Sequence, residues 1–467
     1  MHRPRLLLPY ASCQLAIFGL ALFAETGIVS IIALVIPAAI LNATFMVLAL
    51  MPVRGYVLWV STLCLAVASI IALAFRVTLP DILSAFNKSA SIIVFITVVP
   101  AIAIPIRLGS YVEAMEDFLS GKRGAGKGFR QLRDFLMLAV MHLLMSIALN
   151  IGSIPTMKRL LDKAGLPKRY LSLVYSAGYS SYMVLSPFDG LINALILAAG
   201  TTYAGYFSRG LAMTAAIMVA ACILLLRDKR VFPEGKTQTD DTDTVSEQMH
   251  AAKARAGRKI VELATHIVIM IALSALVIRF CSPVNPMMPT ALVILFWSLV
   301  WTRLLGIPLK KVLGSGKAYV EALAGFRSFL PFLASAGFLG AMIAFTPLKT
   351  GLGELLLMMD GLPRYWTFQA IMLATALLSM VGVHMMISVA AISSALDPAL
   401  LGLSSPGFAL LLLSSWFIAM NISPFVPFST VVAQAIGEKP GTVALRYNLP
   451  MSAMMLFIAP LVLVITG

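Results

Sequence analysis

The sequence predicts an all-α polytopic membrane protein with about 11 transmembrane helices and two opposed re-entrant hairpins, arranged in two inverted repeats. Three observations lead to this prediction: an extreme composition, apolar runs of spanning length, and paired interruptions within those runs. Of the 467 residues, 60% are hydrophobic and 12% are charged, whereas soluble proteins average about 25% charged residues. This composition excludes a soluble enzyme, a disordered protein and a disulfide scaffold, and it favours helices that span a membrane.

The net charge of +15 is explained by the expected membrane topology and does not indicate a nucleic-acid partner. Most Lys and Arg residues lie in short connections between apolar segments, which is the positive-inside pattern. With a cytoplasmic N-terminus, the strongly basic connections fall inside and few cations fall outside, such as Arg76, Arg209, Lys349 and Arg364. We therefore expect a multi-pass protein of the bacterial cytoplasmic (inner) membrane with its N-terminus in the cytoplasm.

Two apolar segments of the N-terminal half are interrupted in the middle. The segment 135–165 is broken at residues 150–155 (NIGSIP). Because it exceeds the ~20 residues of a simple span, we expect a re-entrant hairpin. The segment 170–200 is interrupted at residues 186–190 (SPFDG), which predicts a broken helix. A basic, partly amphipathic stretch before the hairpin, 111–133, is expected to be an interfacial arm.

A polar stretch divides the chain nearly in half and is expected to be a flexible cytoplasmic linker. The second half repeats the order of the first, with a hairpin expected at 368–402 and a broken helix at 406–436. The expected units are a first transmembrane helix (1–27), an N-terminal repeat (28–226), the linker (227–259) and a C-terminal repeat (260–467).

Two short matches support the internal repeat. The matched residues are 142–148 (HLLMSIA) with 384–390 (HMMISVA), at an offset of 242, and 186–188 with 423–425 (both SPF), at an offset of 237. The first match pairs Ser146 with Ser388 and His142 with His384. Five spans and one hairpin in each half would leave the two halves inverted relative to the membrane.

The breaks carry side chains suited to binding a solute and an ion. Non-helical backbone at membrane depth is tolerated only where it is buried in protein or lines a polar cavity, and secondary transporters use discontinuous helices in inverted repeats in this way. Hard oxygen donors suit Na⁺ or the partners of a carboxylate. The candidate residues are Ser146, Asn150, Gly152, Ser153, Ser186, Asp189, Gly190, Ser388, Ser393, Ser394, Asn421, Ser423, Ser429 and Thr430. The alternative is that the hydroxyls only satisfy local helix carbonyls.

Asp189 is the most informative of these residues, since a carboxylate at membrane depth is expensive. Ionised it can hold a cation, protonated it can couple transport to H⁺, and as a helix cap it would be structural. The repeat places Val426 at the equivalent position, so the two sites are expected to differ. His142 and His384 are expected to be either hydrogen-bonded helix contacts or a titrating gate.

The order of spans, arm, hairpin and broken helix, present twice, resembles the ion transporter superfamily. The likeness is greatest to the divalent anion:sodium symporters, which are di- and tricarboxylate carriers. That family has eleven spans, two opposed hairpins, two unwound helices, and a Ser-Asn-Thr signature at the hairpin tips. The corresponding segments here, 146–153 (SIALNIGS) and 388–394 (SVAAISS), lack that string. The resemblance implies that the hairpin tips bind Na⁺ and a substrate carboxylate.

The expected function is secondary active transport of a small anionic solute, with a carboxylate favoured, coupled to Na⁺ or H⁺ by elevator-type alternating access. A Na⁺/H⁺ antiporter, an inorganic-anion carrier and a flippase for lipid-linked intermediates are the alternatives. The chain has no HExxH or GxSxG motif for an intramembrane enzyme, and its four cysteines fit no metal spacing. We expect no catalytic residue, no cofactor beyond the coupling ion and no nucleic-acid partner, while a homodimer remains open.

Overall fold

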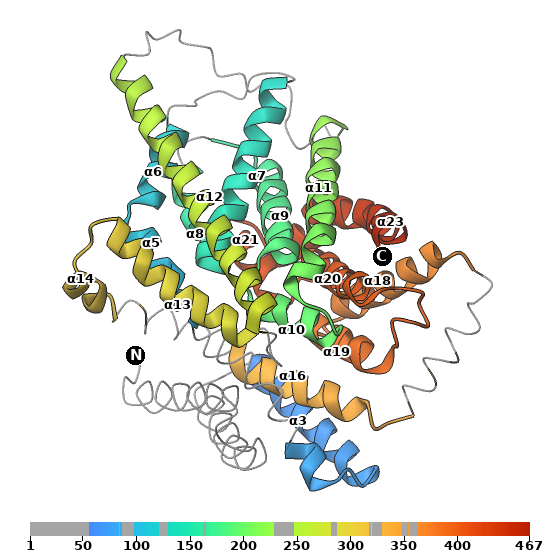
Figure 1. Ribbon diagram of the computed structural model, residues 1–467. Helices are drawn as coiled ribbons and strands as arrows, with labels where there is room; N and C mark the ends of the chain where they lie inside the picture. Colours follow the sequence, from blue (N-terminus) through green and yellow to red (C-terminus); the bar gives the residue numbers. More distant parts are fainter. Residues whose placement is uncertain are drawn as a thin grey trace.

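The computed structural model describes residues 56–83, 85, 98–120, 129–161, 165–227, 247–281, 287–316, 319, 329–347, 351, 354 and 362–467. All regular elements in this part of the chain are helices (Figure 1). In chain order they are α3 (Tyr56–Ala74), η2 (Val99–Ile102), α5 (Ala103–Leu108), α6 (Tyr111–Ser120), α7 (Phe129–Leu149), η3 (Asn150–Gly152), α8 (Ser153–Leu161), α9 (Lys168–Leu185), α10 (Gly190–Ala198), α11 (Tyr203–Arg227), α12 (Glu247–Cys281), α13 (Met287–Leu304), α14 (Leu309–Gly314), α16 (Phe329–Ile343), α18 (Arg364–Met380), α19 (Met385–Ala395), α20 (Ser405–Ile422), α21 (Pro427–Ile436), α22 (Pro440–Thr442), η5 (Val443–Asn448) and α23 (Leu449–Thr466). The first expected span, 1–27, lies outside the described residues.

Several helices have the length and surface of membrane spans. Among the described residues, four helical stretches are long and apolar enough to cross a membrane: Tyr203–Arg227, Ala254–Phe280, Ser405–Ile422 and Pro440–Thr466. Large apolar side chains on the outer helices are exposed, including Trp59, Phe280 and Phe296. Such surfaces are stable against lipid rather than water. The described part of the chain therefore has the helical structure and apolar helices of a multi-pass membrane protein, while the total of 11 spans and the inverted orientation stay predictions.

The polar linker is shorter than the sequence predicts. Helix α12 begins at Glu247, so residues 247–259 are helical and continue directly into the apolar stretch. This segment is rich in Ala, Lys, Arg, Glu and Gln, which are strong helix formers. The expectation of a flexible linker over the whole of 227–259 is therefore wrong for its second part, and residues 228–246 lie outside the described residues.

The two broken helices have the same boundaries in both halves. Helices α9 and α10 are separated by residues 186–189, and helices α20 and α21 by residues 423–426. The offset of 237 relates the first and last residues of α9 to those of α20. Both breaks fall at a Ser-Pro pair, where proline disfavours helical backbone in the preceding residue. Ser186 and Ser423 are accordingly extended.

The second hairpin turns earlier than the sequence predicts. Helices α18 and α19 are joined by residues 381–384, and Gly382 makes this turn possible with a φ of 101°. The first hairpin turns at η3, beyond Ser146. The expected pairing of Ser146 with Ser388 is therefore wrong, because Ser146 precedes its turn and Ser388 follows its own. The same correction separates His142, within α7, from His384, which caps α19.

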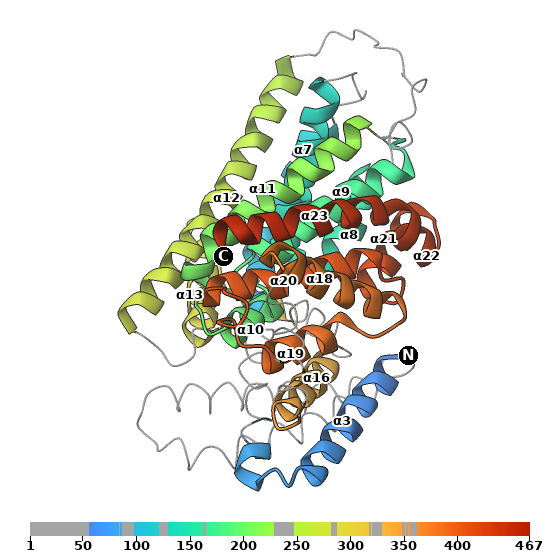
Figure 2. The same cartoon turned by 90° about the vertical axis from the view of Figure 1, so that its right-hand side faces the viewer.

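The hairpin and the broken helix pack against each other in the same way in both halves of the chain. Helix α7 packs against α9, and α18 packs against α20, so each hairpin lies on the broken helix of its own half. The two broken helices cross the middle of the molecule and contact each other, while α21 packs against α8 and α10 against α19 (Figure 2). Nearly every side chain of α9 and α20 is buried. These two helices therefore form the centre of the core.

The stretch expected to be an interfacial arm contains a helix fixed to the second half of the chain. Helix α6 packs against α12. The buried Tyr111 hydroxyl donates to Glu262 Oε1 at 2.6 Å and accepts from Trp301 Nε1 at 3.0 Å. The segment that leads into the first hairpin is thereby tied to α12 and α13. Residues 121–128 of the expected arm lie outside the described residues.

Candidate functional site

Asp189 lies in the break between α9 and α10, and 8% of its surface is exposed. Its Oδ2 accepts a hydrogen bond from the Tyr182 hydroxyl at 2.6 Å and one from Asn150 Nδ2 at 3.1 Å. Its Oδ1 accepts from the backbone N–H of Ile192 at 3.3 Å, which is the contact of a helix cap. Asp189 therefore caps α10, as one of the alternatives from the sequence allowed, and its carboxylate also contacts the first hairpin.

Asn150 joins the tip of the first hairpin to this carboxylate. Its backbone has a φ of 50°, a left-handed conformation that asparagine tolerates better than most residues. Its Oδ1 accepts from the Tyr179 hydroxyl and from the Ile151 N–H, both at 2.6 Å. Its Nδ2 is thereby aimed at Asp189. The hairpin tip and the break of the first half thus meet in one hydrogen-bonded group.

Aromatic rings of α9 lie beside the hydrogen-bonded group of Asn150 and Asp189 and connect it to the second half of the chain. The ring centroids of Tyr179 and Tyr182 are 5.3 Å apart, and Tyr179 stacks on Phe428 of α21 at 5.1 Å. All three side chains are buried. The sequence alone does not mark these three residues as part of a site, because aromatic side chains on an apolar helix usually belong to the hydrophobic core. The four-residue spacing of Ser172, Ser176 and Ser180 on the same helix was the signal that α9 has a polar face.

The three donors named for Asp189 are neutral groups, namely a phenol, a carboxamide and a backbone amide. No group of three or more His, Cys, Asp or Glu side chains that could hold a metal occurs among the described residues.

Two predicted serines and a histidine hold the arms of the first hairpin together. Ser146 Oγ donates to the His142 carbonyl at 2.7 Å and lies 2.9 Å from Ser153 Oγ. Ser153 Oγ in turn lies 3.1 Å from His142 Nε2. A Cβ at Gly178 would lie 2.7 Å from the Ala139 carbonyl, so only glycine lets α9 approach α7 this closely. His142 is therefore a hydrogen-bonded helix contact.

The second break is held by its own hydroxyls. Ser423 Oγ donates to the Ser379 carbonyl at the end of α18 at 2.8 Å, which ties the break to the second hairpin. Ser429 Oγ donates to the Ser423 carbonyl at 2.6 Å, and Thr430 Oγ1 to the Val426 carbonyl at 3.3 Å. Ser429 and Thr430 thus satisfy local backbone, as the alternative interpretation of the sequence allowed.

The serines expected at the second hairpin tip lie on α19 instead. Ser393 Oγ donates to the Ala390 carbonyl at 2.9 Å, one turn back on the same helix. Ser394 lies on α19 beside it and has an intermediate exposure. Ser388 is buried, and its hydroxyl has no hydrogen-bond partner within the described part of the chain. Ser393 is therefore satisfied within its own helix, whereas the buried Ser388 hydroxyl is not.

The remaining predicted residues shape the first break and tip. Ser186 Oγ accepts from the Phe188 N–H at 3.2 Å. Gly190 is the first residue of α10. Gly152 ends η3, and its carbonyl accepts from Thr156 Oγ1 at 3.0 Å. In the sequence, each of these residues lies close to Asn150 or Asp189.

Asn421 ties α20 to α9 through the centre of the core. Its Oδ1 accepts from Ser176 at 2.5 Å, and its Nδ2 donates to Ser180 Oγ and to the Phe417 carbonyl, both at 2.8 Å. Asn421 is therefore a structural link between the broken helices. The sequence predicted it as a ligand, whereas its hydrogen-bonding groups are occupied by protein.

Replacing Asn421 with leucine should destabilise the protein by about 1–2 kcal/mol, since interhelical hydrogen bonds in membranes contribute on that scale. The variant leaves the hydroxyls of Ser176 and Ser180 without their interhelical partner. Thermal unfolding of the purified protein in detergent measures the effect. Ser180→Ala, which removes one partner, should have a smaller effect, and equal melting temperatures for Asn421→Leu and the wild type would contradict this role.

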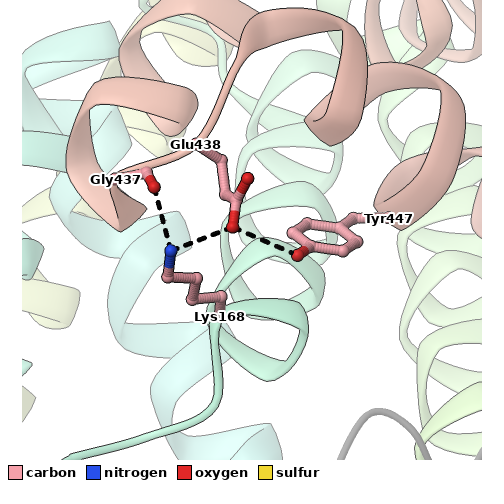
Figure 3. Close-up of polar contacts among 4 residues, drawn as sticks. All are labelled: Lys168, Gly437, Glu438 and Tyr447. Carbon is pink, nitrogen blue, oxygen red and sulfur yellow. Dashed lines mark hydrogen bonds and ion pairs between the residues drawn. The ribbon is translucent and has the colours of Figure 1, made fainter.

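A polar contact at the surface links the start of α9 to the end of α21 (Figure 3). Lys168 Nζ donates to the Gly437 carbonyl and to Glu438 Oε1, both at 2.9 Å. The Tyr447 hydroxyl donates to the same carboxylate oxygen at 3.5 Å. Gly437 caps α21 with a φ of 67°, which places its carbonyl toward Lys168. The hydrogen bond from Lys168 lowers the pKa of the Glu438 carboxyl.

This link should stabilise the protein at neutral pH and lose its effect in acid. The pKa of Glu438 is lower in the folded than in the unfolded chain, so the contribution is present above its ordinary value of 4.5 and disappears as pH falls through the lowered value. The melting temperature of Glu438→Gln should lie slightly below that of the wild type at pH 7, because exposed ion pairs contribute little. The two should converge well below pH 4.5, and a difference that persists there would contradict the assignment.

Comparison with known proteins identifies the fold. No family model matches the sequence, and no curated protein matches it. The YdaH transporter of Alcanivorax borkumensis, whose topology is described as unusual, is 14% identical with a TM-score of 0.58 over 87% of this chain and 97% of that one. MtrF of Neisseria gonorrhoeae, described as illuminating a class of antimetabolite efflux pumps, is 16% identical with a TM-score of 0.59 over 90% of this chain and 97% of that one.

At these identities the likeness establishes the fold alone: the chain has the fold of solved membrane transporters over nearly their whole length. Both of these solved structures are of transporters. The closer resemblance to divalent anion:sodium symporters stays a prediction.

Proposed function

We propose that this protein is a secondary active transporter that moves a small anionic solute across the membrane, coupled to Na⁺ or H⁺. The observation that carries the proposal is the contact between Asn150 at the hairpin tip and Asp189 in the broken helix. A buried carboxylate at such a junction is expensive and therefore typical of ion-coupled sites. The transporter fold of YdaH and MtrF supports the same conclusion.

The two breaks suit different ligands in this proposal. Helix α10 begins with a carboxylate on its cap, which suits the coupling cation or proton. Helix α21 begins after Val426, whose side chain makes no capping bond. A helix N-terminus without a capping side chain favours an anion, so we place the solute's carboxylate near α21. The stack between Tyr179 and Phe428 lies between the two breaks and connects them.

Elevator-type alternating access is the movement that we propose for the cycle. The hairpins and broken helices share one large hydrophobic cluster. Helices α3 and α16 form a second cluster, which includes Cys64, Ala68, Phe338 and Met342. In the proposed movement the first cluster would belong to the moving part and the second to the stationary part, with the contact between α16 and α19 as the surface on which they slide.

The test is uptake into proteoliposomes that contain the full-length protein, with a panel of mono-, di- and tricarboxylates. A Na⁺ gradient and a pH gradient are imposed separately. We expect accumulation of at least one carboxylate above its equilibrium level under one gradient and none in protein-free liposomes. Equilibration without accumulation would contradict coupling, and exchange of Na⁺ for H⁺ with no carboxylate flux would favour an antiporter.

Export is the second candidate, and the likeness to MtrF favours it, since MtrF is described with a class of antimetabolite efflux pumps. The same coupling site would serve either direction. The sign of the gradient in inside-out vesicles distinguishes the two, because an antiporting exporter accumulates solute in them only under an outward proton or sodium gradient. An importer of the symport type would instead accumulate solute under an inward gradient.

A further inference from the structure

A hollow lies at the end of α13, far along the chain from the candidate site. Gly306 turns the chain with a φ of 70°, and the short helix α14 folds back beside α13 (Figure 1). The cavity has a volume of about 160 Å³ and is lined by Leu299, Thr302, Arg303, Ile307, Leu309 and Val312. One water molecule needs roughly 10–15 Å³ of such space. The hollow therefore has room for a chemical group much larger than one water.

The rim of the hollow is apolar and open. Leu299 is 51% exposed and Leu309 is 46% exposed, whereas Ile307 at the floor is buried. Thr302 Oγ1 donates to the Leu299 carbonyl at 2.8 Å, so the hydroxyl in the wall is already satisfied. On the outer surface of a membrane protein, exposed leucines of this kind contact acyl chains. The occupant must therefore present hydrocarbon to the rim.

One cation lines the hollow, Arg303, and two more, Lys310 and Lys311, lie in the chain between its lining residues Leu309 and Val312. Arg303, Lys310 and Lys311 are all exposed, and none forms an ion pair within the described part of the chain. The sequence has no Asp or Glu between residues 263 and 320. The distribution of Lys and Arg predicts that this end of α13 is cytoplasmic, at the level of the lipid headgroups. An occupant that matches this charge is an anion.

We propose that the hollow binds an anionic phospholipid of the phosphatidylglycerol type. Arg303 lines the cavity and would contact the phosphate, while Lys310 and Lys311 would add charge from α14. Leu299 and Leu309 would contact the first part of an acyl chain. Basic pockets beside transmembrane helices on the cytoplasmic side bind such headgroups. The lipid would tie α14 to the end of α13.

The test is titration of the purified full-length protein in detergent with phosphatidylglycerol and with phosphatidylcholine, followed by native mass spectrometry. We expect saturable binding that favours phosphatidylglycerol. Each basic residue near an anionic lipid contributes about 1 kcal/mol, so the triple variant R303Q/K310Q/K311Q should bind it roughly 100-fold more weakly. Arg279→Gln, which removes an exposed cation near the other end of α13, is the matched control and should bind like the wild type.

Two further experiments distinguish lipid binding in the hollow from general electrostatic attraction of anionic lipid to the protein surface. Val312→Trp fills the hollow and keeps all three cations, so it should weaken binding about tenfold or more while leaving the melting temperature unchanged. Wild-type binding by Val312→Trp or by the triple variant would overturn the proposal, as would equal binding of both lipids. Displacement of the lipid by millimolar glycerol phosphate or inorganic phosphate would also overturn it, because the site would then recognise a free anion.

Discussion

Replacing Asp189 with asparagine should abolish coupled uptake in proteoliposomes and leave the protein folded. Asparagine caps helices about as well as aspartate, so the contact to the Ile192 N–H can persist. The negative charge is lost, and with it the group that can hold a cation or a proton. Hydrogen bonds to charged groups contribute about 1.5–3 kcal/mol each, so we expect transport to fall at least tenfold.

Uptake driven separately by a Na⁺ gradient and by a pH gradient then shows which ion Asp189 binds. Loss of Na⁺ dependence in Asp189→Asn would support direct ligation of Na⁺, whereas residual exchange that no longer depends on pH would support a proton site. Asp397 offers a matched control, because its carboxylate caps an exposed turn through the Ala399 N–H at 2.9 Å. Asp397→Asn should transport normally. Wild-type behaviour of Asp189→Asn under both gradients would mean that Asp189 only caps α10.

Replacing Asn150 should have the second largest effect, and two substitutions separate its side chain from its backbone. Asn150→Leu removes the hydrogen bonds to Asp189 and from Tyr179. It also places a branched side chain at a φ of 50°, which costs about 1–2 kcal/mol. Asn150→Gly loses the same hydrogen bonds but tolerates the backbone conformation. Both variants should lose transport, and only Asn150→Leu should show a clearly lowered melting temperature.

Initial uptake rates and thermal unfolding in detergent check this pair together. Ser393→Ala is the control, since its hydroxyl bonds only within α19 among the described contacts, and it should match the wild type in both measurements. If Asn150→Gly transports at the wild-type rate, the carboxamide takes no part in the site. The hairpin tip would then need only its backbone shape.

The broken helices were the part of the fold that local sequence chemistry could predict. Proline disfavours helical backbone in the residue before it, and both breaks fall at a Ser-Pro pair, so the sequence signal and the structure agree there. The second hairpin was harder. Its turn depends on Gly382, while the similarity between 142–148 and 384–390 is a match of apolar residues that carries little information.

The site was predictable only where a residue type is rare and energetically costly at membrane depth. Asp189 was such a residue, since a buried carboxylate needs an explanation. Serines and asparagines have many uses, so Asn150 and Asn421 looked alike in the sequence, although one meets Asp189 and the other joins two helices. Tyr179 and Tyr182 were missed because only the folded chain shows where their hydroxyls point.

The absence of a side chain at Gly178 has a mechanical consequence. With the backbones of α7 and α9 in direct contact, the first arm of the hairpin cannot slide along the broken helix without a collision at the Ala139 carbonyl. We therefore expect α7 and α9 to move together as one rigid unit. A pair of spin labels on α7 and α9 should keep a single distance throughout the proposed transport cycle. The displacement of every other helix can then be measured relative to this pair.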